Sequence, residues 1–123
     1  MTKTVVDCGN CGPDFNAIRN MLKASFDVKV VQTHGPEDTL EFLRANDVVL
    51  VTVNRKLDRD YSDGMEVIRL LKADSQTASV PVMLITNYDE HQQAAMEIGA
   101  LQGFGKLSLN EPQTFDRLQA VLG

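Results

Sequence analysis

The sequence lacks several features that would place it in a specialised class of protein. Two cysteines among 123 residues cannot form a disulfide framework, which favours a cytoplasmic protein with reduced thiols. No apolar run is long enough to span a membrane, and the first residues lack the apolar segment of a signal peptide. No basic cluster interrupts a net charge of −5, which argues against nucleic-acid binding.

The remaining composition is that of an ordinary globular protein, with 43% hydrophobic and 24% charged residues. A chain of this length can bury one core, and we find no internal repeat or linker. We therefore expect a single domain over residues 1–123.

Continuous apolar and β-branched runs mark the expected strands. The clearest is Asp-Val-Val-Leu-Val-Thr-Val-Asn at residues 47–54, which is typical of a strand buried on both faces, as in a parallel sheet. Further strands are expected at residues 4–7, 27–32, 80–85 and 101–105. Apolar residues at helical spacing, together with turn signals, predict helices that begin near residues 13, 36, 64, 89 and 112.

This alternation of strands and helices predicts an α/β fold, with a parallel sheet covered by helices on both faces. Ligands of such sheets bind outside the carboxyl ends of the strands. Polar residues follow the strands at that edge, and we take them as the candidate site: Asp7, Cys8, Asn54, Thr86 and Lys106.

Four segments resemble the receiver domain of two-component response regulators, over nearly the whole chain. They are Val5-Val6-Asp7, residues 49–54 followed by 63–68, residues 81–86, and residues 99–106. The resemblance implies a flavodoxin-like (βα)5 sandwich, with a parallel five-stranded sheet of order 2-1-3-4-5. It also implies a role in signal transduction.

The resemblance places each candidate residue in a receiver site. Asp7 keeps one of the acidic places after the first strand, and Cys8 is its neighbour. Thr86 matches the hydroxyl position and Lys106 matches the lysine. Asn54 falls where receivers carry the phospho-accepting aspartate, so the resemblance indicates a degenerate, or pseudo-, receiver that is not an enzyme.

The chemistry of Asn54 supports this interpretation. An amide nitrogen is not nucleophilic, and Mg²⁺ favours carboxylate ligands, of which Asp7 is the only clear one. We therefore expect no cofactor beyond weak Mg²⁺ binding at Asp7, and an ion pair between Lys106 and Asp7. In an alternative interpretation, Asn54 only caps neighbouring backbone groups.

Two alternative functions remain open. One is a phosphate-accepting receiver that uses Asp58 or Asp60, in the loop after the central strand. The other is a thiol redox switch at Cys8-Gly-Asn-Cys11, because a helix start lowers thiol pKa values. Asp7 beside Cys8 should raise the pKa of that thiol and reduce its reactivity.

The two histidines do not complete a zinc site, which needs four ligands. We expect His34 and His91 to be exposed residues at turns or helix starts.

The resemblance also implies a protein partner, with a histidine kinase as one candidate. The family's usual contact face corresponds here to residues 89–98, 101–105 and 112–122. Phe104 is the candidate for the aromatic residue of the receiver switch, although the matching position is Gly103.

Overall fold

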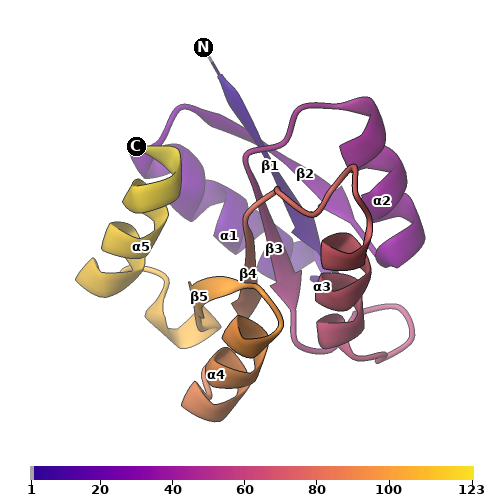
Figure 1. Cartoon of the computed structure of the whole chain (residues 1–123). Coiled ribbons are helices and arrows are strands. Elements are labelled where there is room, and N and C mark those ends of the chain that lie inside the picture. Colours follow the sequence, from indigo (N-terminus) through magenta and orange to yellow (C-terminus); the bar gives the residue numbers. More distant parts are fainter. Residues whose placement is uncertain (1) are drawn as a thin grey trace.

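The computed structural model describes residues 2–123, which form a sheet with helices on both faces (Figure 1). The strands are β1 (Lys3–Cys8), β2 (Val28–Thr33), β3 (Leu50–Asn54), β4 (Val82–Ile85) and β5 (Leu101–Phe104). The helices are α1 (Gly12–Ser25), α2 (Pro36–Ala45), α3 (Gly64–Ala73), α4 (Asp89–Glu97) and α5 (Pro112–Leu122), with a short 3-10 turn, η1 (Lys106–Ser108).

The sheet has five parallel strands in the order β2-β1-β3-β4-β5, which confirms the predicted flavodoxin-like fold. Two predicted strands are shorter than expected at their starts. The central strand begins at Leu50 rather than residue 47, and β4 begins at Val82, after Pro81. Proline has no N–H to donate to a sheet ladder, so β4 begins after it.

Local chemistry sets the starts of the helices. Proline occupies the first turn of α1, α2 and α5, where a missing N–H costs nothing. The Asp38 side chain accepts hydrogen bonds from the backbone N–H groups of His34 and Gly35, at 2.8 and 2.9 Å. Asp63 caps α3 by accepting from the Met65 N–H at 2.9 Å.

Successive strand residues point to opposite faces and fill two cores. Val6, Val51 and Leu84 face a core closed by α2, α3 and α4. Val5 and Leu50 face a second core closed by α1 and α5, on the other side of the sheet (Figure 1). This two-sided burial holds the carboxyl ends of the strands at one edge, where the candidate site lies.

No helix within residues 2–123 is both long enough and apolar enough to cross a membrane.

Candidate functional site

A hollow of about 380 Å³ lies at the carboxyl edge of the sheet. Three of the predicted site residues line it: Asn54 at the end of β3, Thr86 just after β4, and Lys106 at the start of η1. Its other lining residues are Arg55, Lys56, Ile85, Asn87, Tyr88 and His91. Asp7 and Cys8 do not line this hollow, because both are fully buried in the sheet.

Asn54 uses its side-chain amide to hold the backbone of two loops. Its Nδ2 donates to the carbonyl oxygen of Lys56 at 2.6 Å and to that of Gly9 at 3.2 Å. Both carbonyl oxygens can only accept hydrogen bonds, so the side chain at position 54 must be a donor. An ionised carboxylate there would face two oxygen atoms and could donate to neither. These contacts agree with the alternative interpretation, in which Asn54 caps neighbouring backbone groups.

Asp7 is fully buried and does not line the hollow. Its Oδ1 accepts hydrogen bonds from Thr52 at 2.7 Å and from Asn10 at 2.8 Å, and its Oδ2 has no partner. Burial raises the pKa of Asp7 to about 6, although the bonds from Thr52 and Asn10 and the charge of Lys106 act in the opposite direction. Neither Asn10 nor Thr52 was predicted from the sequence, because neither belongs to a recognisable motif.

The residues present do not fit a receiver-type Mg²⁺ site. Asp7 is the only carboxylate among the five candidate residues at the sheet edge, and it is fully buried with the equally buried Asn10 bonded to it. Within residues 2–123, no group of three or more His, Cys, Asp or Glu side chains is arranged to hold a metal ion. Mg²⁺ needs hard oxygen ligands around an open, hydrated position, which a single buried carboxylate does not supply.

The expected ion pair between Lys106 and Asp7 is wrong. Lys106 Nζ instead contacts Asp14 Oδ2 at 2.8 Å, in the first turn of α1. The pKa of Asp14 is lowered, chiefly by its hydrogen bond with Lys106. Lys106 pairs with the partly exposed carboxylate because Asp7 is enclosed, and its charge reaches Asp7 only at longer range.

The Thr86 hydroxyl is already engaged by its neighbours. Its Oγ1 lies 3.2 Å from Nδ1 of His91 and accepts from the Tyr88 N–H at 3.3 Å. The prediction that His91 is an exposed residue is therefore wrong, since it is half-buried between Thr86 and the Tyr88 ring.

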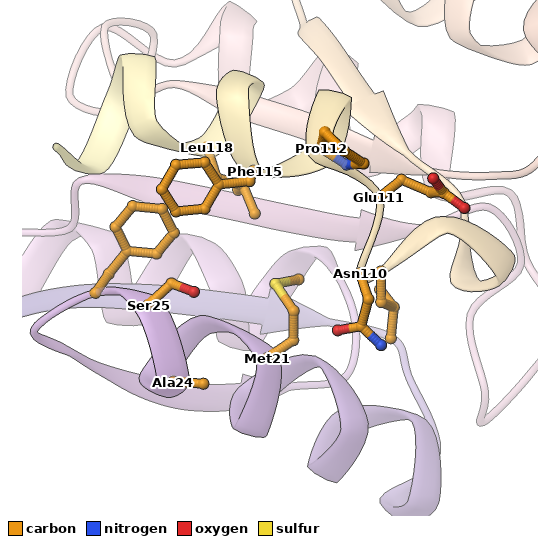
Figure 2. A pocket seen from close by; sticks show the side chains of 10 residues that line it. Met21, Ala24, Ser25, Asn110, Glu111, Pro112, Phe115 and Leu118 are labelled. Carbon is orange, nitrogen blue, oxygen red and sulfur yellow. The ribbon is translucent and has the colours of Figure 1, made fainter.

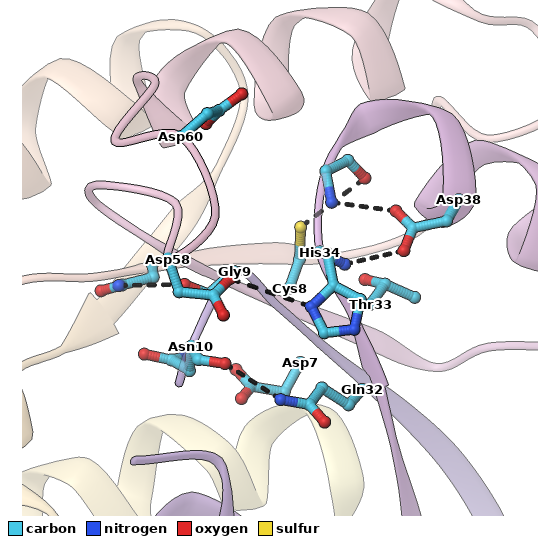
Figure 3. Close-up of polar contacts among 12 residues, drawn as sticks. Asp7, Cys8, Gly9, Asn10, Gln32, Thr33, His34, Asp38, Asp58 and Asp60 are labelled. Carbon is cyan, nitrogen blue, oxygen red and sulfur yellow. Dashed lines mark hydrogen bonds and ion pairs between the residues drawn. The ribbon is translucent and has the colours of Figure 1, made fainter. Parts of the chain in front are cut away.

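The two cysteines lie in different environments, as Figure 3 shows for Cys8. Cys8 is fully buried beside Thr39, whose hydroxyl lies 3.3 Å from its sulfur. Burial raises the pKa of the Cys8 thiol to about 11, and Asp7 adds to this rise, as the sequence predicted. Cys11 is exposed at the start of α1, and both thiols are free.

The alternative acceptors Asp58 and Asp60 lie in the loop between β3 and α3 (Figure 3), and neither lines the hollow. Asp58 Oδ1 is 3.8 Å from Nδ1 of His34, and neither atom has a hydrogen-bond partner. His34 is half-buried, so its expected exposure is also wrong. Asp60 is exposed and accepts two hydrogen bonds from Ser62, which lower the pKa of the Asp60 carboxyl.

Gln92 joins α4 to the last two strands and was not singled out from the sequence. Its Nε2 donates to the carbonyl oxygens of Leu84 and Thr86, at 2.9 and 3.3 Å. Its Oε1 accepts from the Gly103 N–H at 2.8 Å, where the pairing of β4 and β5 is irregular. An added Cβ at Gly103 would lie 2.2 Å from the Leu84 carbonyl oxygen, so only glycine fits there, while Phe104 is a core residue.

A second, smaller hollow of about 200 Å³ lies between α1 and the start of α5 (Figure 2). Met21, Leu118 and the stacked rings of Phe26 and Phe115, 5.5 Å apart, form its apolar part. Glu111 is the only ionisable residue that lines this hollow, so its lining lacks the set of polar groups that a catalytic site needs.

The sequence matches no protein-family model and no curated protein. Several solved structures share its fold. A signal receiver domain of a DNA-binding response regulator (merR) from Colwellia psychrerythraea 34H is 18% identical with a TM-score of 0.80, covering 96% of each chain. A putative response regulator from Chloroflexus aurantiacus J-10-fl is 17% identical with a TM-score of 0.83, covering 98% of each chain.

The chemotaxis protein CheY4 of Vibrio cholerae is 18% identical with a TM-score of 0.71, covering 99% of this chain and 100% of its own. Identities this low establish the fold and nothing finer. The chain has the fold of the response-regulator receiver domains.

Proposed function

We propose that this chain is a receiver-like module of two-component-type signalling that acts through protein–protein contact, without accepting a phosphoryl group at position 54. The observation that carries the proposal is the arrangement of Asn54. Its amide donates to two backbone carbonyls, and no carboxylate lines the hollow beside it. A receiver that transfers phosphate needs a carboxylate nucleophile at that place, and an amide cannot form an acyl phosphate.

Several features support a contact role for α4, β5 and α5. β5 is an edge strand, and Leu101 on it is 44% exposed. Tyr88, at the start of α4, is 62% exposed. Exposed apolar side chains at a sheet edge are a common component of protein interfaces, and a histidine kinase is one candidate partner.

The phosphotransfer part is tested by incubating the protein with acetyl phosphate and Mg²⁺, followed by intact mass under denaturing conditions. We expect no phosphoryl adduct. The control is the double variant Asp58→Asn with Asp60→Asn, which removes both alternative acceptors. An adduct on the unaltered protein that this variant loses would replace our proposal with a shifted-acceptor receiver.

The contact part is tested in cells by placing a photo-crosslinking amino acid at position 101, and separately at Lys29. Lys29 is exposed on β2, the opposite edge of the sheet. We expect a discrete protein adduct from position 101 and none from position 29. Equal crosslinking from both edges, or none from position 101, would contradict the proposed contact face.

A further inference from the structure

The charged side chains that line the hollow beside Asn54 are all basic, although the whole chain is acidic. Three basic side chains line it, Arg55, Lys56 and Lys106, and no aspartate or glutamate does. The chain as a whole carries a net charge of −5. A concave surface lined by one sign of charge concentrates ligands of the other sign.

The cations retain donors for a ligand. Arg55 contacts Asp63 at 3.0 Å through one nitrogen, and Lys106 contacts Asp14 at 2.8 Å. Guanidinium has five N–H donors and ammonium three, so each pair leaves donors unused. Lys56 is exposed and forms no ion pair with any residue in the described range 2–123.

The wall made by Tyr88 and His91 gives the hollow an aromatic side. The two rings pack edge to face, with centroids 5.4 Å apart. The Nδ1 atom of His91 is engaged by Thr86, while the Tyr88 ring is 62% exposed and available for stacking. The volume of about 380 Å³ lies within the usual range for small-molecule sites, roughly 300–1,000 Å³.

We propose that this hollow binds a small organic phosphate that carries a planar ring, without forming a covalent bond to it. Lys56 and Arg55 contact the phosphate, and Tyr88 packs against the ring. Multiple cations favour a phosphate monoester, whose charge exceeds that of a carboxylate. The Asn54 amide is occupied by backbone carbonyls and is not a ligand. The proposal does not depend on which protein partner the module binds.

The test is an NMR titration of the ¹⁵N-labelled protein with adenosine monophosphate at physiological salt, and in parallel with adenosine. We expect saturable shifts at residues 54–56, 86–91 and 106 with the monophosphate. Adenosine should bind at least about tenfold more weakly, because it lacks the charge. Equal binding of the two, or no saturable shift with the monophosphate, would overturn the proposal.

Variants identify the contacts. Lys56→Gln should weaken monophosphate binding by about fivefold, as expected for one exposed charge-assisted contact. Lys23→Gln makes the same charge change on the exposed surface of α1 and should leave the affinity unchanged. Equal weakening by both variants would show attraction without a site and would overturn the proposal. The phosphotransfer test uses denaturing mass spectrometry, which detects only covalent adducts. The noncovalent binding of the monophosphate is therefore independent of the result of that test.

Discussion

Asp7 is the residue whose ionisation should most affect stability. Burial raises its pKa to about 6, above the ordinary aspartate value of about 3.9. The folded protein therefore holds a proton that the unfolded chain releases, and stability falls as pH rises between about pH 4 and 6. Asp7→Asn removes the buried charge, so we expect it to raise the free energy of unfolding at pH 7.5 by about 2–3 kcal/mol.

Urea unfolding measured across pH checks this prediction for Asp7. The gain from Asp7→Asn should shrink to less than about 1 kcal/mol near pH 4, where the folded-state carboxyl is protonated. Asp116→Asn, at an exposed position on α5, is the matched control and should change little at any pH. A gain that does not vary with pH would show that Asp7 is not ionising in this window.

Asn54→Asp tests the amide that stands at the acceptor position. An ionised carboxylate there would face the carbonyl oxygens of Gly9 and Lys56, to which it cannot donate a hydrogen bond. We expect a loss of about 2–3 kcal/mol in the free energy of unfolding without metal. Added Mg²⁺ should recover part of this loss, because the variant supplies the carboxylate that the site lacks.

Asn54→Ala is the control, since it removes the same hydrogen bonds without adding charge. It should lose less stability than Asn54→Asp and show no recovery with Mg²⁺. Thermal denaturation with and without Mg²⁺, together with titration calorimetry, measures both effects. Tight Mg²⁺ binding by the unaltered protein would show that the site holds more ligands than we have counted.

The two thiols should differ in reactivity because they differ in burial. Cys8 is buried with a pKa raised to about 11, whereas Cys11 is exposed. We expect iodoacetamide to modify Cys11 in the folded protein at a rate that rises with pH, and Cys8 only after unfolding. Peptide mapping after timed alkylation checks this. Rapid modification of Cys8 at neutral pH, with loss of partner binding on oxidation, would favour the thiol switch.

At the scale of elements, Gln92 replaces a regular ladder bond between β4 and β5. Its side chain bonds Leu84, Thr86 and Gly103, and all these atoms are away from solvent. Gln92→Ala removes three buried hydrogen bonds, so we expect a loss of about 2–4 kcal/mol in the free energy of unfolding. Urea unfolding and hydrogen exchange at the Gly103 amide measure it. Gln93→Ala, one position along α4 and exposed, should be nearly neutral.

At the scale of the whole molecule, the carboxyl edge should keep one conformation. The receiver switch couples the hydroxyl after the fourth strand to an aromatic residue on the fifth. Here Thr86 is bonded to His91 and the Tyr88 N–H, and Phe104 is 2% exposed in the core. We expect no millisecond exchange at residues 84–92 or 101–106 in relaxation-dispersion NMR. Correlated exchange at Thr86 and Phe104 would contradict this prediction.

The sequence by itself determined the fold and the edge at which the polar residues gather. Apolar runs with β-branched residues alternate with helical spacing, and parallel strands place all their carboxyl ends together. Asn54, Thr86 and Lys106 could therefore be assigned to one hollow from strand ends alone, and the structure places them there.

Only the tertiary structure decided which partners these residues take. Lys106 pairs with Asp14, 92 positions away, because burial of Asp7 within the sheet makes the exposed carboxylate the accessible one. Asn54 bonds Gly9 and Thr52 bonds Asp7, each across 45 positions. Such contacts depend on which loops come together in the folded chain. Neither local periodicity nor the position of a strand end predicts which loops these are.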